Sequence, residues 1–511
     1  MHADSITRRQ LLTRFGVLGG SSLMLGAMDA WGLKGAPAGP RPVLRGTQPT
    51  TPVVVLGGGI SGLIAGWELA KLDYDVRILE ARDWVGGLTW TVRRGDTHTE
   101  IDGERQVCDF DEGQYINAGA WRIPKTDEGI LGYCRELGVA LEIFVNADDA
   151  NFFYEENAAL GALSGRRVRL REVKADLWGS TTELLAKAMD RGDIDVPLSE
   201  EDKERLVQFL VRSGYLDDAD HVYRPPGSRG SEDRYDLSAL LQSGFGARAR
   251  SLNQETGGPA PLFQPIGGMQ QIAYAFQRVL GDRLTLRAEV RSVRQTEDEV
   301  RVVWRDTATS QEREQVADYV VCCLPMSVLK QIDINLSPDM ATAVGETGHA
   351  AVAKMGLQMR RRFWEEDEGI FGGHLWSRSL QLGEFSYPSN GYFTQKGVLL
   401  GYYGASAQAG LAAMPVAGRI EHVLAQASKV HAQMREAFET AYCAWWEKIP
   451  YSHGAYGRTP GAELLAKLSE PDGRIYLGSA GASTDPAWLE GAVESAWRSI
   501  EHLHARVSRG A

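Results

Sequence analysis

Beyond the first 40 residues, apolar residues first gather where a buried strand is followed by a helix. Residues 53–56 form an unbroken apolar run, which is typical of a strand that is covered on both faces. A glycine-rich turn follows, and residues 63–72 have helical character. A second strand is predicted over residues 75–79, ending at Glu80. This order of elements predicts the start of a parallel α/β sheet.

The turn between strand and helix carries a nucleotide-binding pattern. Gly57, Gly59 and Gly62 have the spacing GxGxxG. The first glycine allows a tight turn, the second lets a pyrophosphate approach the backbone, and the third lets the helix pack on the strand. Glu80 follows about 20 residues later, where an acid accepts hydrogen bonds from ribose hydroxyls. Together these features predict a dinucleotide site, whereas an isolated glycine motif would indicate only a turn.

The first 40 residues are predicted to be a signal and linker rather than part of the fold. Arg8 and Arg9 precede residues 15–28, an apolar stretch of 14 residues without a charge. The stretch is too short to span a bilayer and suits a signal h-region, and small residues follow it. The pattern resembles a twin-arginine signal and implies a periplasmic or secreted protein. The alternative is a chance arginine pair before an amphipathic helix.

Composition narrows the function classes. Hydrophobic residues make up 43% of the 511 residues and charged residues 24%, as in ordinary globular proteins. The net charge of −12 argues against nucleic-acid binding. Five cysteines without a CxxC pair predict neither a disulfide framework nor a metal site, and Cys322 and Cys323 lie in an apolar run typical of a core. No stretch is long and apolar enough to predict a membrane anchor in the mature protein.

Segments after Glu80 resemble the flavin amine oxidase family, which includes monoamine oxidases and L-amino acid oxidases. The sequence EARDWVGG at residues 80–87 is similar to the family's segment after the acidic residue. The resemblance extends from residue 53 to about residue 500. Its other segments are residues 264–269, residues 288–290, residues 318–325, Lys354 with residues 363–365, residues 397–402 and residues 487–492.

The resemblance implies an α/β fold with a discontinuous Rossmann-type FAD domain over residues 50–124, 260–347 and 455–511. A mixed-sheet substrate domain is expected over residues 348–454. Residues 125–259 have little strand character, helices are predicted over residues 130–141 and 200–213, and a loop over residues 224–234. This part is similar to the helical insert that shapes the substrate funnel of amino acid oxidases.

The resemblance identifies the dinucleotide as FAD. Alanine stands at position 455, where monoamine oxidases attach the flavin through cysteine, so we expect non-covalent FAD. Leu88 and Ala480 replace a family arginine and a family glutamate; the two charges are hypothesised to have been lost together, the alternative being weak FAD binding or a degenerate site. The implied contacts are Gly57, Gly59, Ile60, Ser61, Gly62, Glu80, Ala81, Arg82, Gly86, Gly87, Leu88, Gly119, Ala120, Trp121, Arg122, Val290, Ser479, Ala480, Trp488, Leu489 and Ala492.

The substrate class is inferred mainly from Arg122. Residues 117–124 resemble the L-amino acid oxidase segment whose arginine binds the substrate α-carboxylate, and a guanidinium can grip a carboxylate with two hydrogen bonds. The resemblance adds Tyr402 as a second donor to this carboxylate, and Tyr456, Ala487 and Trp488 as further substrate contacts. The alternatives are an ion pair of Arg122 with a nearby acid (Asp109, Asp111 or Glu112) and ordinary core packing for the aromatic residues.

The expected reaction is the oxidation of an L-amino acid by oxygen to a 2-oxo acid, ammonium and hydrogen peroxide. Lys354 and Trp488 are the expected catalytic residues, and Lys354 is implied to hold a water near flavin N5; the alternative for Lys354 is a surface lysine on a strand. His98, His349 and His453 are loose candidates for a general base. An amino acid monooxygenase, a primary amine oxidase and an inactive flavin-binding protein remain alternatives. The sequence does not decide between a monomer and a homo-oligomer.

Overall fold

The computed structural model describes residues 40–48, 51–192, 198–225, 234–251 and 261–510. The expected twin-arginine signal therefore lies outside the described residues. Within them, no helix combines the length and the apolar character needed to cross a membrane.

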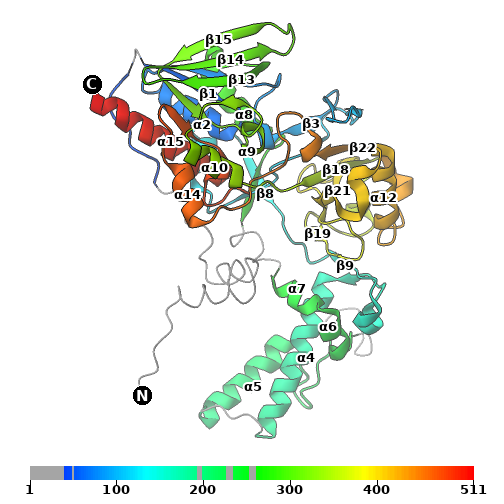
Figure 1. Cartoon of the computed structure of the whole chain (residues 1–511). Helices are drawn as coiled ribbons and strands as arrows, with labels where there is room; N and C mark the ends of the chain where they lie inside the picture. The colour runs from blue at the N-terminus through cyan, green and yellow to red at the C-terminus, as the bar shows by residue number, and fades with distance from the viewer. Residues whose placement is uncertain (1–39, 49–50, 193–197, 226–233, 252–260, 511) are drawn as a thin grey trace.

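A parallel sheet forms the centre of the first lobe (Figure 1). Its strands run in the order β12-β2-β1-β16-β23, and all its pairs are parallel. Their bounds are β12 Leu284–Thr285, β2 Asp75–Leu79, β1 Pro52–Leu56, β16 Tyr319–Cys322 and β23 Ile475–Leu477. The sheet joins segments that are far apart in sequence, and the expected Rossmann-type α/β fold is confirmed.

The unbroken apolar run of β1 serves two cores, one on each face of the sheet. Val53 and Val55 pack with helices α2 (Ile60–Ala70), α8 (Gln270–Leu280) and α15 (Leu489–Gly510). Val54 and Leu56 face the opposite core, which is covered by a second sheet, the short helix α9 (Met326–Leu329) and two longer helices. That sheet has the order β15-β14-β13-β17, and the covering elements are β15 Glu312–Ala317, β14 Val300–Asp306, β13 Ala288–Gln295, β17 Asp333–Ile334, α10 Pro338–Glu346 and α14 Ala462–Ser469.

The second lobe is built on a five-stranded sheet with the order β19-β20-β21-β18-β22. The pairs between these strands are all antiparallel, and the one parallel element described at this sheet, where a mixed one was expected, is the isolated bridge from Gly383 to Tyr403 of β21. The bounds are β19 His374–Leu375, β20 Phe385–Ser386, β21 Gly397–Ala405, β18 Val352–Met359 and β22 Phe438–Trp445, with helix α12 (Val416–Ala427) packed against it. All residues of β18 are buried, because this strand lies between two cores.

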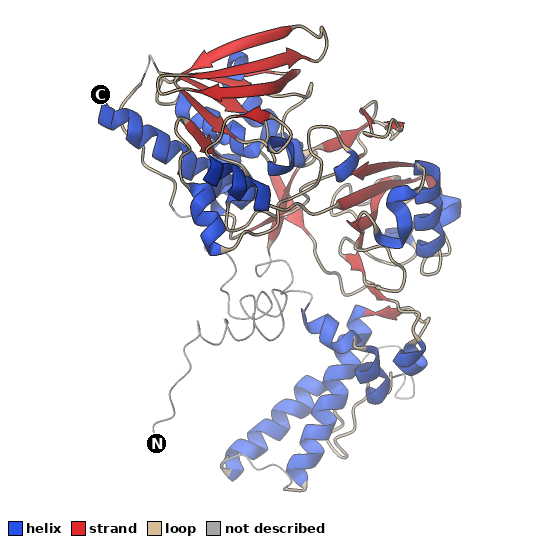
Figure 2. Cartoon of the chain, viewed as in Figure 1, coloured by secondary structure: helices blue, strands red, loops and turns tan. Residues whose placement is uncertain are grey.

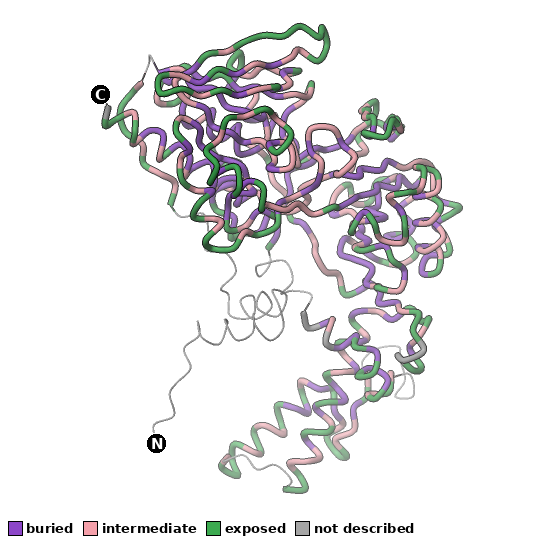
Figure 3. Tube along the Cα trace, in the orientation of Figure 1, coloured by how far each residue is buried: buried purple, intermediate pink, exposed green. Residues whose placement is uncertain are grey.

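The helical segment projects away from both lobes (Figure 2). It contains α4 (Leu170–Asp190), α5 (Glu200–Gly214), α6 (Leu237–Ser243) and α7 (Phe245–Ser251). Helix α3 (Glu128–Glu136) lies instead on the first lobe against α15, so only the later part of residues 125–259 forms the arm. Buried residues concentrate in the two lobes and are sparser along α4 and α5 (Figure 3). Most of the expected loop 224–234 lies outside the described residues.

Candidate active site

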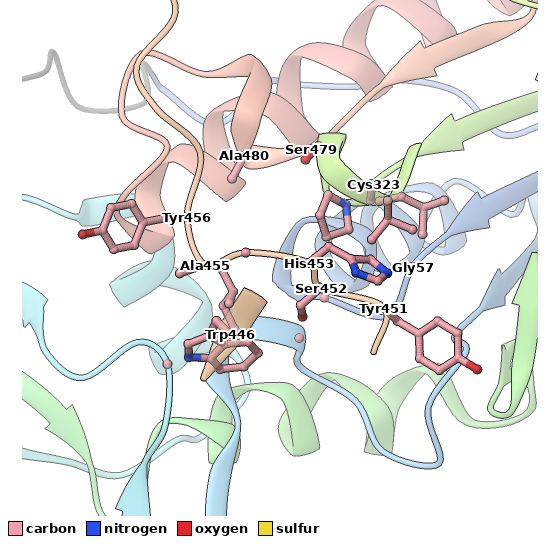
Figure 4. A pocket seen from close by; sticks show the side chains of 18 of the residues that line it. Gly57, Cys323, Trp446, Tyr451, Ser452, His453, Ala455, Tyr456, Ser479 and Ala480 are labelled. Atoms are coloured by element: carbon pink, nitrogen blue, oxygen red, sulfur yellow. The ribbon is translucent and has the colours of Figure 1, made fainter. Parts of the chain in front are cut away.

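A cavity of about 600 Å³ runs from the β1–α2 turn of the first lobe to strands β18 and β21 of the second. Figure 4 shows part of its lining, with Gly57 at the turn and Trp446, Ala455 and Tyr456 across from it. Its walls come from the two glycine segments, residues 118–122, the start of β13, residues 450–457 and the start of α15. None of the described residues between 125 and 259 lines it. The described helices α4 and α5 extend away from the lobes, and the expected role of the helical insert in shaping a substrate funnel stays a prediction.

The glycine turn leaves the backbone open at one end of the cavity. Gly57 has a φ of +97°, a conformation that side chains disfavour. A Cβ on Gly62 would lie 2.0 Å from the carbonyl oxygen of Gly57, so α2 can follow β1 this closely only with glycine there. No atom lies within 4 Å of a Cβ built on Gly59, which leaves the N-terminus of α2 accessible to an anionic group.

Glu80 is fixed at the end of β2 by backbone donors. Its Oε2 accepts a hydrogen bond from the N–H of Gly58 at 2.7 Å, and its Oε1 accepts one from the N–H of Arg82 at 2.9 Å. Each oxygen keeps a lone pair for a further donor. The second glycine segment is tied to the first, because the N–H of Gly86 donates to Gly58 O at 2.8 Å. Both glycine segments and the acid thus converge on one cavity.

A second helix N-terminus reaches the cavity from the other side. Helix α15 begins at Leu489, and Trp488, Leu489 and Ala492 line the cavity. A Cβ on Gly491 would lie 2.1 Å from Asp485 O, so glycine lets the first turn pack tightly on the preceding loop. The unpaired N–H groups of this turn give a partial positive charge at the wall.

Lys354 lies in the interior and not on the surface. It is only 3% exposed, and its Nζ donates to Gly119 O at 2.6 Å. Burial lowers the pKa of Lys354 to about 7; nearby Arg122 lowers it further, while Glu384 opposes the shift. The ammonium group is therefore partly deprotonated at neutral pH. The surface-lysine alternative is excluded by this burial.

Arg122 brings a second cation to the same end of the cavity. Its guanidinium lies 4.6 Å from the ring centroid of Trp121. Its Nη1 is buried and has no hydrogen-bond partner among the described residues. Glu384 is its described ion-pair partner, with 3.7 Å between Nη1 and Oε2, whereas Asp109, Asp111 and Glu112 form no such pair with it. Arg122 therefore brings to the cavity wall a guanidinium whose hydrogen-bonding capacity is not fully met by the described residues.

Tyr402 is not at the cavity, and its neighbour Tyr403 is. Tyr402 is fully buried in the second lobe, stacks on Trp445 and donates to Ala405 O at 2.5 Å. The cause is a bulge in β21: Met355 pairs with Tyr402, but Gly356 pairs with Leu400, so Gly401 is an extra residue. Regular alternation would put Tyr402 on the face of Val398, and the bulge puts Tyr403 there instead.

The family assignment comes from comparison with known proteins. The chain matches the family described as flavin containing amine oxidoreductase over residues 60–502. It belongs to this family. Relatives include the flavin-dependent L-tryptophan oxidase RebO of Lentzea aerocolonigenes, 27% identical over 89% of this chain and 98% of that protein. An L-amino-acid oxidase of Notechis scutatus scutatus is 23% identical over 89% of this chain and 88% of that protein.

Solved structures show the same fold. Wild-type putrescine oxidase bound to putrescine has a TM-score of 0.58 and 20% identity, covering 90% of this chain and 99% of that one. The flavin amine oxidoreductase described here is accordingly an oxidoreductase that uses a flavin. At this identity the solved structures bear on the fold alone.

The cavity residues fit a flavin dinucleotide. The open backbone at Gly59, the fixed carboxylate of Glu80 and the two helix N-termini supply groups for phosphates and ribose without any metal. Leu88 and Ala480 line the cavity without charge, so neither leaves an unpaired ion behind. Ala455 also lines it and offers no thiol. When bound, the flavin supplies the two-electron oxidation.

The structure brings nearly all predicted site residues to this one cavity. Apart from Gly62, which acts in helix packing, and Tyr402, every residue proposed to contact cofactor or substrate lines it. His349 and His453 also line it, whereas His98 lies elsewhere with its Nδ1 against the Tyr442 hydroxyl. Burial lowers the pKa of all three histidines, which keeps them neutral near pH 7. Sequence reasoning missed Tyr403, Trp446 and Tyr451.

Proposed function

We propose that this flavin amine oxidoreductase oxidises an L-amino acid to a 2-oxo acid, ammonium and hydrogen peroxide, with non-covalently bound FAD. The observation that supports this most directly is that Arg122 lines the cavity while its buried Nη1 has no hydrogen-bond partner among the described residues. A carboxylate is the ligand that a guanidinium satisfies best, and a simple amine has none. The L-amino-acid oxidases among its relatives point the same way.

In this proposal the residues around Arg122 hold the substrate in one orientation. Arg122 binds the α-carboxylate, and Tyr403 takes the place first assigned to Tyr402 as a second donor. Tyr456 and Trp488 form aromatic walls, and Ala487 borders the space between them. Fixing a reacting carbon against an acceptor removes rotational and translational freedom before the reaction, which lowers its barrier.

Lys354 is proposed to hold a water in the site. Its Nζ donates a hydrogen bond to Gly119 O at 2.6 Å and a longer one to Asn117 O at 3.4 Å. With its pKa near 7, the neutral amine is well populated and keeps a lone pair that accepts a hydrogen bond from water. The α-amino group of the substrate must also be neutral for hydride loss, so the reaction is expected to favour mildly alkaline pH.

Anaerobic spectral titration with each of the twenty L-amino acids tests the proposal. Bleaching of the yellow chromophore by an amino acid, followed by formation of 2-oxo acid and peroxide in air, is the expected result. An amide with CO2 would instead identify a monooxygenase, and an aldehyde from a simple amine a primary amine oxidase. A yellow protein that nothing bleaches would be an inactive flavin binder, and an apoprotein that FAD cannot reconstitute would remove the oxidase proposal.

Export of the folded holoprotein is also proposed, from the Arg8-Arg9 pair and the apolar stretch behind it. Export after folding suits a protein that captures its cofactor inside the cell. Replacing both arginines with lysine should retain the yellow protein in the cytoplasm of a bacterial host. Unchanged fractionation of that variant would contradict a twin-arginine signal.

A further inference from the structure

A carboxylate faces Arg122 from just outside the cavity wall. Nη1 of Arg122 and Oε2 of Glu384 lie 3.7 Å apart, and each atom is buried without a hydrogen-bond partner among the described residues. The separation is too long for a direct hydrogen bond. The two charges therefore attract each other while each keeps an unmet hydrogen-bonding capacity.

The backbone holds Glu384 beside the cavity. Its N–H donates to Tyr403 O at 2.7 Å. At the preceding Gly383, with φ of +63°, a Cβ would lie 2.0 Å from that same carbonyl oxygen, so glycine permits this close crossing of the two chains. The Glu384 side chain is nevertheless 38% exposed, so part of it is reachable from solvent.

The charge of Glu384 is felt by residues that do line the cavity. It raises the pKa of Lys354 against the larger lowering caused by burial and Arg122. It also adds to the effect of burial in raising the pKa of Tyr403 and of Tyr456. A ligand at this end of the cavity would lie within the same electrostatic range.

We propose that Glu384 sets the charge preference of the substrate pocket, favouring amino acids with a cationic side chain and disfavouring those with a second carboxylate. This inference rests on the proposed function, in which Arg122 takes the α-carboxylate. When Arg122 binds the α-carboxylate, its positive charge is divided between the substrate and Glu384. The negative charge of Glu384 is then less fully neutralised. A cation at the end of the substrate side chain is attracted by the negative charge of Glu384, whereas a second carboxylate is repelled by it.

Three carboxylates without an α-amino group test the preference independently of turnover. They are 4-guanidinobutanoate, pentanoate and glutarate, whose chains end in a cation, an apolar group and an anion. Their dissociation constants are measured by calorimetry on the flavin-loaded protein and on Glu384→Gln. The matched control is Glu421→Gln, which removes an exposed carboxylate of α12 that is paired with Arg435, away from the cavity.

The wild type is expected to bind 4-guanidinobutanoate best and glutarate worst. Glu384→Gln should shrink the ratio of their two dissociation constants by about tenfold, as one partly screened charge would. Glu421→Gln should leave that ratio at the wild-type value. An unchanged ratio in Glu384→Gln, measured on a variant with wild-type melting temperature, would overturn the proposal.

A fourth ligand separates this proposal from the function on which it rests. Butylguanidine carries the cation without a carboxylate, so its binding depends on Glu384 and not on Arg122. Weaker butylguanidine binding in Glu384→Gln, together with no oxidation of any amino acid, would leave Glu384 as a cation site in an enzyme of another specificity. Oxidation of amino acids with no effect of Glu384→Gln on any ligand would refute the Glu384 inference alone.

Discussion

Lys354 and Tyr403 pair directly across the antiparallel strands β18 and β21, and the lysine Nζ lies 4.4 Å from the centroid of the tyrosine ring. The cation and the ring share the face of the sheet that borders the cavity. This pairing exists because the extra residue Gly401 shifts the register of β21. The bulge thus decides which of two adjacent tyrosines takes part in the site.

The two tyrosines should respond differently to the loss of a hydroxyl. Tyr403→Phe is expected to raise KM for the best amino acid about tenfold, because a donor to a charged carboxylate is lost. Tyr402→Phe should leave KM near the wild-type value and lower the free energy of unfolding by about 1 kcal/mol, because it loses the hydrogen bonds of the hydroxyl to Ala405 O and to the Gln408 side chain, both away from the cavity. Steady-state kinetics and denaturant melts on both variants give the comparison. The opposite pattern would restore Tyr402 to the site.

Replacing the buried Lys354 should change stability in a pH-dependent way. The folded-state pKa of Lys354 is about 7, below the usual 10.5. Below pH 7 the lysine is protonated in both the folded and the unfolded state, so the folded protein bears the full cost of the buried charge. This cost falls as pH rises from 7 to 10.5. Lys354→Met should therefore be more stable than the wild type by about 3 kcal/mol at pH 6, with a smaller difference at pH 9.5. Chemical denaturation at both pH values measures this. A difference independent of pH would mean that the lysine is not titrating near neutrality.

The nucleotide half of the site could be predicted from sequence because its signals are local. Gly57, Gly59 and Glu80 belong to one continuous strand–turn–helix–strand unit, and local spacing fixes their geometry. Trp446 and Tyr451 reach the cavity only because distant strands meet, and no local pattern marks them. The position of Tyr403 depended on one extra residue in β21, which period-two alternation cannot detect.

The arm formed by α4 and α5 shows a different limit. Apolar periodicity predicts α5 almost to the residue, since residues 200–213 were expected and Glu200–Gly214 is observed. Periodicity does not say against which surface a helix packs. The place of the arm away from the cavity depends on contacts such as the stacking of Phe245 on Phe153, which joins residues widely separated in sequence.

Ala455 offers a test of where the cofactor lies. Its side chain is 7% exposed and borders the cavity, so Ala455→Cys would bring a thiol to the wall without enlarging it greatly. If the flavin ring lies there, a thioether forms with loss of one hydrogen from the thiol and one from a ring methyl, and oxygen takes up the two electrons. Yellow colour should then stay with the protein after acid precipitation.

The control for that variant is Ala444→Cys, which is also buried, at 2% exposure, but does not line the cavity. Its flavin should be released by acid as in the wild type. Release of flavin from Ala455→Cys as well, with the free thiol still detectable, would place the ring elsewhere along the cavity.

Removal of the Arg122 guanidinium should separate substrate binding from cofactor binding. Arg122→Ala is expected to raise KM by about two orders of magnitude, since a buried charge partner of the carboxylate disappears. Flavin content after purification should stay at the wild-type level, because the glycine turns and Glu80 hold the other end of the dinucleotide. Arg122→Lys keeps the charge but cannot make two parallel hydrogen bonds to a carboxylate. Its KM should lie between that of the wild type and that of Arg122→Ala. Arg435→Ala removes an exposed arginine paired with Glu421 and should match the wild type in both measurements. Wild-type kinetics in Arg122→Ala would refute the carboxylate clamp, whereas loss of flavin from it would show that the arginine serves the cofactor instead.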